Sequence, residues 1–214
     1  MKKYTAFFDF DNTITPFDVL DDILERFSKN SEWVDLEEKW EDGLIGSREC
    51  LEGQIKGIRI DKRTLDNYLS GIKVDDYFKK IKALFAARGI ELVILSDNFD
   101  YILNRILTKN GLDNLKIYSN KLKFTKEGLR PVFPFVNKDC LKCAHCKKSS
   151  LTSNINNGEL KVYVGDGLSD VCSSKCADLV FAKEALLEHY RDNKLSCIPY
   201  KSLKDVYEYF RSEP

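Results

Sequence analysis

Two aspartates near the start of the chain, Asp9 and Asp11, have the spacing and setting of catalytic carboxylates. They follow the apolar run Tyr4-Thr5-Ala6-Phe7-Phe8, which has the composition of a buried β-strand. Two positions apart on an extended chain, both carboxylates lie on one side and can reach one point. Beside a divalent cation, one can attack phosphorus while the other exchanges a proton with the leaving group. The structural alternative is an acidic helix cap and turn.

Three later segments carry the other side chains that phosphoryl transfer needs. A hydroxyl group can hold phosphate oxygens, a lysine can neutralise phosphoryl charge, and carboxylates can hold Mg²⁺, which prefers oxygen ligands. Because several strand ends meet in one crevice of a doubly wound sheet, we expect these groups to converge on the first two aspartates. Each group alone also fits a cap, a solvated charge or a turn. The predicted set is Ser96, Asp97, Lys147 or its neighbour Lys148, Asp166 and Asp170.

The segments between these groups predict the framework that holds them. From about residue 16 to residue 71, apolar residues recur at helical spacing and no strand-like run occurs, which predicts a helical module directly after the first strand. Strand-like and helix-like runs then alternate, which predicts the α/β class with a doubly wound parallel sheet. The expected division is a core of residues 1–15 and 76–214 with a helical cap of residues 16–75.

Individual elements are predicted from apolar periodicity and from capping residues. A hairpin is expected within residues 120–135, where the chain alternates around a glycine turn. Expected strands span residues 4–8, 91–95, 116–119, 160–164, 179–181 and 197–198, and expected core helices span 76–88, 101–110, a segment from 147, 184–191 and 202–210.

Composition indicates a globular protein without a charged partner. The chain has 214 residues, of which 43% are hydrophobic, enough for one core and a smaller appended module. Lys and Arg number 34, as do Asp and Glu, so no overall field would attract nucleic acid or anionic lipid. The apolar stretch after the N-terminal lysines is too short for a secretion signal or a membrane span. We therefore expect a cytoplasmic location with neither a nucleic-acid nor a membrane partner, while the oligomeric state stays open.

A cysteine cluster offers a second chemistry. The chain has seven cysteines, and three of them, Cys140, Cys143 and Cys146, are spaced C-x2-C-x2-C beside His145. The odd total without a secretion signal favours reduced thiols over a disulfide framework. The cluster lacks the second half of a usual zinc pattern, which Cys172 and Cys176 could complete through folding. Zinc binding, reversible oxidation of close cysteines and plain thiols all remain open.

The four groups of polar residues together resemble the motifs of the haloacid dehalogenase superfamily of phosphatases. They read DFDNT, LVILS, CK and GDGLSD, and the resemblance extends over nearly the whole chain. The helical insert after the first motif is similar to the cap of the phosphoserine phosphatase branch. The stretches YVGDGLSD and CADLVFAK resemble a narrower group. This group contains the methionine-salvage enolphosphate phosphatases and the phosphocholine, phosphoethanolamine and pyridoxal phosphate phosphatases.

The resemblance implies a role for each motif residue. Asp9 would be the nucleophile that forms an aspartyl-phosphate, and Asp11 would be the general acid and base, with its backbone carbonyl facing Mg²⁺. Asp9 and Asp166 would also bind Mg²⁺, and Asp170 would belong to the metal site by acting indirectly, through a neighbouring ligand or through a bound water. The resemblance favours Lys147 over Lys148 as the phosphate-binding lysine. Ser96 and Asp97 complete the implied substrate site.

The resemblance leaves the leaving group of the phosphate ester open. Asp18 stands where the phosphoserine enzymes carry a glutamate that contacts substrate, so a cationic or polar leaving group is possible. Ser169 replaces an asparagine common in those enzymes, which weakens phosphoserine as substrate. Further candidates on the cap, each of which also fits a solvated or core position, are Arg48, Gln54, Arg59, Trp33 and Trp40.

Two other classes of function are considered beside a phosphatase. A signalling domain that accepts phosphate on aspartate also has an acidic strand end, but it needs neither Asp11 nor a helical cap. A zinc-binding or redox-regulated thiol protein would use the cysteine cluster. The sequence therefore predicts a Mg²⁺-dependent phosphatase of a small phosphate ester, with these two alternatives.

Overall fold

Seven strands form one sheet in the order β4-β3-β2-β1-β5-β6-β7. The computed structural model describes residues 3–140, 142–154 and 158–212. Adjacent strands are parallel except β3 and β4, which form an antiparallel hairpin at the edge. The strands are β1 (Tyr4–Phe8), β2 (Glu91–Phe99), β3 (Lys116–Thr125), β4 (Gly128–Val132), β5 (Leu160–Gly165), β6 (Leu179–Ala182) and β7 (Ile198–Pro199). The predicted α/β class with a doubly wound sheet is confirmed.

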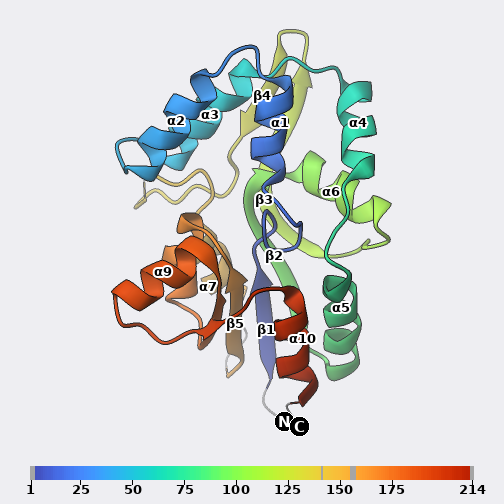
Figure 1. The fold of residues 1–214 in the computed structure, drawn as a ribbon, viewed down its shortest axis with the longest axis vertical. Helices are drawn as coiled ribbons and strands as arrows, with labels where there is room; N and C mark the ends of the chain where they lie inside the picture. The colour runs from blue at the N-terminus through green and yellow to red at the C-terminus, as the bar shows by residue number, and fades with distance from the viewer. Residues whose placement is uncertain (1–2, 141, 155–157, 213–214) are drawn as a thin grey trace.

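Helices cover both faces of the sheet (Figure 1). In that view α5 and α10 lie on one side of β1, and α7 and α9 lie on the other. The core helices are α5 (Asp76–Arg88), α6 (Asp100–Lys109), α7 (Lys147–Thr152), α8 (Val171–Ser174), α9 (Glu184–Asp192) and α10 (Leu203–Ser212), and a 3₁₀ turn, η1, spans Leu168–Asp170.

Alternation along β1 divides the core into two layers. Phe7 belongs to a buried cluster with residues of α7 and α9, whereas Phe8 belongs to the larger cluster on the opposite face. In the larger cluster, the rings of Phe85 from α5 and Phe210 from α10 meet edge to face with centroids 4.9 Å apart. Burial on both faces explains why β1 is mostly apolar and why the first charged residue, Asp9, comes only after its end.

Helix α5 shows how local signals set the element boundaries. Its N-cap Asp75 accepts a hydrogen bond from the backbone N–H of Tyr77 at 2.7 Å. Its C-cap Gly89 has a φ of 66°, a left-handed conformation that glycine adopts without steric cost. Both boundaries agree with those expected from the sequence.

Four helices form the insert between β1 and α5: α1 (Val19–Phe27), α2 (Glu32–Glu41), α3 (Ser47–Gly57) and α4 (Lys62–Gly71). They lie beyond the C-terminal end of β1, next to the β3–β4 hairpin (Figure 1). Two strands are longer than expected, because β2 continues to Phe99 and β3 to Thr125. The pairing of β2 with β3 is irregular between Leu95 and Phe99, which is where the polar residues of the second motif lie. The exact limits of core and cap stay a prediction.

None of the described helices is both long enough and apolar enough to span a membrane.

Candidate active site

The site lies at the point where the order of the strands changes direction: β2 and β3 lie on one side of β1, and β5 and β6 lie on the other. Strand β1 pairs with β2 on one side and with β5 on the other, so the ends of β1 and β5 form the crevice at which α/β sheets bind ligands. Asp9 directly follows β1, and its backbone N–H donates to the carbonyl of Val164 in β5 at 2.9 Å. Asp166 directly follows β5. The first and fourth motifs are therefore brought together by strand pairing.

Lys147 is buried at the centre of this crevice. It is the first residue of α7, and its side chain is only 3% exposed. Its Nζ donates to Asp9 Oδ1 at 2.9 Å, to Asp170 Oδ1 at 2.8 Å and to Ser169 Oγ at 3.0 Å. Burial opposes its charge, but the carboxylates of Asp170 and Asp9 outweigh burial and raise the pKa of Lys147. The neighbouring Lys148 is exposed, so geometry favours Lys147, as expected.

Asp170 holds the loop after β5 in place. Its Oδ2 accepts hydrogen bonds from the backbone N–H groups of Asp166 at 3.1 Å and Gly167 at 3.2 Å, and its Oδ1 accepts one from the Tyr163 hydroxyl at 2.7 Å. A Cβ at Gly165 would lie 2.3 Å from Asp170 Oδ2, so this position has no room for any other residue. Every oxygen of this carboxylate is therefore already engaged by the protein.

Asp166 is oriented by the loop after β1. Its Oδ1 accepts a hydrogen bond from Thr13 Oγ1 at 2.5 Å, and its Oδ2 accepts one from Asn12 Nδ2 at 3.1 Å. The same amide of Asn12 donates to Glu184 Oε2 at 2.5 Å. Burial and the neighbouring Asp170 raise the pKa of Asp166 to about 6. Asn12 and Thr13, which follow the first motif's aspartates, thus fix the carboxylate of the fourth motif.

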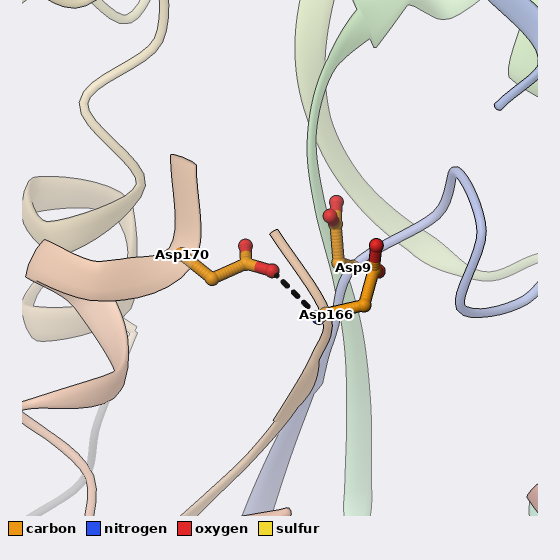
Figure 2. Close-up of side chains that lie close together, drawn as sticks. All are labelled: Asp9, Asp166 and Asp170. Atoms are coloured by element: carbon orange, nitrogen blue, oxygen red, sulfur yellow. Dashed lines mark hydrogen bonds between the residues drawn. The ribbon is translucent and has the colours of Figure 1, made fainter. Parts of the chain in front are cut away.

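Three carboxylates here have the donor chemistry of a magnesium site. Asp9, Asp166 and Asp170 each offer an oxygen, and these atoms lie within 4.8 Å of one another. Figure 2 shows Asp9 and Asp166 side by side, with Asp170 reaching toward the backbone of Asp166. The pKa of Asp9 is raised mainly by burial and next by the negative charge of Asp170. Lys147 acts in the opposite direction but does not outweigh them. A divalent cation would offset the remaining charge, and oxygen ligands suit Mg²⁺, so the residues fit this ion.

Asp11 is not part of this group and is held between β2 and the start of α1. Asn98 Nδ2 donates to both of its carboxylate oxygens at 3.1 Å, and the backbone N–H of Val19 donates to Oδ1 at 3.0 Å. Burial, together with the negative charge of Asp18, raises the pKa of Asp11 well above its ordinary value. A raised pKa favours the protonated form of the carboxyl group, which is the form that a general acid needs.

Ser96 and Asp97 lie in the irregular part of β2. Ser96 is fully buried, and its Oγ accepts the backbone N–H of Asn98 at 3.0 Å. Its carbonyl accepts from His145 Nδ1 at 3.0 Å, and the other ring nitrogen contacts Ser150 Oγ at 2.7 Å. Asp97 lines the site cavity, and Ser96 is not among its lining residues. The phosphate-binding role of both residues stays a prediction.

A cavity of about 110 Å³ separates the catalytic crevice from the cap. From the core it is lined by Asp9, Asp11, Asp97, Asn98, Lys147 and Ser169, and from the cap side by Asp18, Leu20, Asp21, Glu37, Trp40, Ser47, Cys50, Leu51 and Gln54. A more open hollow continues from it to the surface and adds Glu41 and Glu184. Among these described lining residues Lys147 is the single cation, and it already contacts two carboxylates.

Three cap carboxylates, Asp18, Asp21 and Glu37, form what we call the acidic cap cluster. The pKa of Asp18 is raised to about 6, mainly by burial and next by the negative charge of Asp21. The pKa of Asp21 is also raised to about 6, mainly by burial and next by the negative charges of Glu37 and Glu41. Glu37 accepts a hydrogen bond from Gln54 Nε2 at 2.6 Å, and burial is the main cause of its raised pKa. The cluster has no cationic partner among the described lining residues.

The other cap candidates separate into pocket and non-pocket positions. Trp40 and Gln54 line the cavity, whereas Trp33 packs against the hydrophobic core. Arg48 lies over the ring of Phe133 and pairs with a glutamate on its own helix, outside the cavity. Arg59 lines a separate surface hollow between α3 and the β3–β4 hairpin.

Several contributors to the site were not expected from the sequence. Asn98 holds the carboxylate of Asp11, and Asn12 and Thr13 hold that of Asp166. Asp21 and Glu37 complete the acidic cap cluster. Asn98 stands two residues after Ser96, a spacing that could have indicated a shared face of the strand. The cap residues carried no comparable signal, because acids on a surface helix are ordinary.

The cysteine loop gains no support as a zinc site. The only group of three or more metal-type ligands found among the described residues is the aspartate group. Both ring nitrogens of His145 are used within the core, and Cys146 is buried against Ser149.

Comparisons with known proteins give the family of the chain. Residues 4–191 match a family model described as "Putative Phosphatase". The 2-hydroxy-3-keto-5-methylthiopentenyl-1-phosphate phosphatase of Geobacillus thermodenitrificans is 27% identical over 219 residues, covering 98% of this chain and 96% of the relative. The enzyme of the same name from Brevibacillus brevis is 26% identical, covering 96% and 94%.

Solved structures share the fold. A substrate-bound phosphoserine phosphatase complex superposes with a TM-score of 0.75 at 21% identity, covering 98% of this chain and 99% of that one. The phosphoserine phosphatase from T. onnurineus gives 0.74 at 17% identity, covering 100% and 96%. The chain therefore belongs to the phosphatase family matched by its residues 4–191, and it shares the fold of the phosphoserine phosphatases.

Proposed function

We propose that this phosphatase is Mg²⁺-dependent, forms an aspartyl-phosphate on Asp9, and acts on a small phosphate monoester whose leaving group carries a positive charge. The observation that supports the leaving group is the acidic cap cluster, Asp18, Asp21 and Glu37, which faces the catalytic carboxylates across a small cavity. With Mg²⁺ and Lys147 at the catalytic end, the phosphate would meet positive charge, whereas the leaving group would meet the negative charge of the acidic cap cluster.

The nucleophilic role of Asp9 is supported by its two oxygens being differently engaged. Its Oδ1 accepts from Lys147 and from the backbone N–H of Phe10 at 2.8 Å, whereas Oδ2 accepts no hydrogen bond from the described residues. In the proposed reaction Oδ2 attacks phosphorus, and the bond to the leaving oxygen breaks as Asp11 donates its proton to that oxygen. Asp11 then takes a proton from the water that attacks the phosphorylated aspartate. Lys147 balances the phosphoryl charge.

Mg²⁺ would be held by Asp9, Asp166 and the backbone carbonyl of Asp11, and when bound it supplies Lewis-acid stabilisation of phosphoryl charge. Asp170 acts in this proposal by orienting Lys147 and the loop that carries Asp166, since its oxygens are already engaged. The metal role predicted for Asp170 is therefore indirect here.

Charge complementarity favours an ammonium group on the substrate. A buried carboxylate gains most from a partner of opposite charge, and a hydrogen bond between charged groups contributes about 1.5–3 kcal/mol. Trp40 adds an aromatic face beside the cluster, which suits an ammonium or trimethylammonium group. A leaving group that also carries a carboxylate, such as serine, would find no free cation among the described lining residues.

The catalytic part is tested with p-nitrophenyl phosphate in the presence and absence of Mg²⁺. We expect turnover to require Mg²⁺ and to be abolished by Asp9→Asn, because uncatalysed phosphate monoester hydrolysis is extremely slow. Turnover that survives Asp9→Asn and Asp11→Asn would show that the nucleophile and the acid/base are assigned wrongly.

The leaving-group part is tested with two esters of nearly equal shape, 2-aminoethyl phosphate and propyl phosphate. We expect kcat/KM to favour the amine by roughly 10- to 100-fold, and Asp21→Asn to remove most of this preference. Asp22→Asn is the matched control, because Asp22 faces Arg26 and Tyr68 instead of the cavity. Equal kcat/KM values for the two esters would contradict an ammonium-binding cap.

A further inference from the structure

Two cysteines of the segment between β4 and α7 lie in contact, although the phosphatase reaction uses neither. The sulfurs of Cys140 and Cys143 are 3.2 Å apart, within hydrogen-bond distance for thiols. Both residues are partly exposed. A disulfide requires a sulfur separation of about 2.05 Å, so a movement of about 1 Å would bring the two atoms into bonding distance.

We propose that Cys140 and Cys143 form a dithiol that a peroxide converts reversibly into a disulfide, and that this change alters the cap side of the active-site cavity.

The two thiols have the unequal properties of an attacking and a resolving cysteine. The hydrogen bond between the two thiols is the main cause of a lowered pKa at Cys140, and Lys142 adds to it. Burial, then the hydrogen bond and negative charge of Cys140, raises the pKa of Cys143 to about 12. Cys140 is therefore the first to be present as thiolate. Oxidation of Cys140 removes the negative charge that helps to raise the pKa of Cys143, so Cys143 can then lose its proton more readily.

The proposed chemistry consumes one peroxide for each disulfide. The thiolate of Cys140 attacks one peroxide oxygen, the O–O bond breaks, and hydroxide leaves, giving a sulfenic acid on Cys140. The sulfur of Cys143 then attacks the sulfur of Cys140, the S–O bond breaks, and hydroxide takes up the proton from Cys143. With hydrogen peroxide, two thiols lose two electrons in total and two water molecules form. A small thiol such as dithiothreitol reverses the change by exchange.

The other five cysteines lack this arrangement. Among the described residues, no other hydrogen bond between two sulfurs is found. Cys50 is buried, and burial with the nearby Glu37 raises the pKa of its thiol. Cys146 is buried against Ser149. Cys172 is exposed and provides a comparison for simple accessibility.

The pair is linked to the cavity through the start of α3. The carbonyl of Lys142 accepts the backbone N–H of Arg48 at 3.5 Å, and the backbone N–H of Ala144 donates to Ser47 Oγ at 2.9 Å. A Cβ at Gly46 would lie 2.4 Å from the Lys142 oxygen, so the two backbones are in close contact. Ser47 lines the cavity. A displacement of Lys142 and Cys143 is therefore transmitted to the cap wall.

The test treats the full chain with a small excess of hydrogen peroxide, blocks free thiols, and maps linked peptides by mass spectrometry. We expect a Cys140–Cys143 link to form first and to disappear with dithiothreitol. In Cys143→Ser, Cys140 should stop at sulfenic acid, and in Cys140→Ser neither position should react early. Cys172→Ser is the matched control and should leave the link unchanged. Faster modification of Cys172, or absence of the link, overturns the proposal.

The second readout is kcat/KM for 2-aminoethyl phosphate before and after oxidation, and this readout alone rests on the proposed function. Because a misplacement of about 1 Å can cost up to ~100-fold in rate, we expect a fall of roughly tenfold, reversed by dithiothreitol and absent in Cys143→Ser. Unchanged kinetics with the link formed would refute the coupling to the cavity. An enzyme inactive in both states would instead refute the proposed function and leave the mapped link standing.

Discussion

Replacement of Lys147 by methionine tests whether the buried charges of the site depend on one ammonium group. The lysine Nζ donates to Asp9, Ser169 and Asp170 at 2.8–3.0 Å, and Asp170 is fully buried. Methionine keeps the length and apolar contacts of the side chain but removes the charge. Two carboxylates that shared one cation would then be left together in the interior.

Breaking a buried ion pair by removing one partner costs about 3–5 kcal/mol, because the remaining charge is uncompensated. For a chain of this size, 1 kcal/mol corresponds to about 2–4 °C in Tm, so we expect a loss of roughly 6–20 °C at neutral pH. The loss should shrink as the pH falls. The pKa of Asp9 is raised in the folded protein, so its protonation stabilises the fold, and this stabilisation is lost as the pH rises through the folded pKa.

The measurement is thermal unfolding followed by circular dichroism at several pH values, with Mg²⁺ removed. Lys148→Met is the matched control, since Lys148 is exposed on the same helix and should change Tm little. A Lys147→Met variant that melts within about 2 °C of this control at neutral pH, or whose deficit grows on acidification, would refute the proposed electrostatics.

Three further predictions concern the loop, the cap and the metal. Gly165→Ala should lower the free energy of unfolding by about 1–3 kcal/mol in urea titrations, since its Cβ would meet Asp170, while Gly167→Ala, with open space, should not. The preference for 2-aminoethyl over propyl phosphate should weaken as the pH falls below about 6, where Asp18 and Asp21 become protonated and lose their charge; a preference that is constant from pH 5 to 8 contradicts this. Chelation of divalent ions should abolish turnover and added Mg²⁺ should restore it, as followed by phosphate release.

Local signals explain why much of the fold could be predicted. Asp75 and Gly89 mark the ends of α5 by capping chemistry that depends only on neighbouring residues. The apolar run of β1 predicts a buried strand for the same reason, and Asp9 at its end predicts a site. Convergence of the motifs followed from the rule that parallel strand ends meet at one edge.

Contacts between distant segments explain what was missed. The hydrogen bonds of Asn98 to Asp11 and of Thr13 to Asp166 depend on strand register, which the sequence does not state. The acidic cap cluster depends on how α1 and α2 face the cavity. In the sequence, Glu37 is one acid among several on an amphipathic helix.

Trapping the covalent intermediate is the most direct test of the central claim. The enzyme would be mixed with substrate and Mg²⁺, quenched within milliseconds, and treated with borohydride, which reduces a phosphorylated aspartate but leaves a free carboxylate unchanged. Peptide mapping then identifies the reduced residue. The proposed reaction predicts reduction at Asp9 alone, and none in Asp9→Asn. Reduction at another aspartate, or full turnover with no trapped residue, would contradict the account.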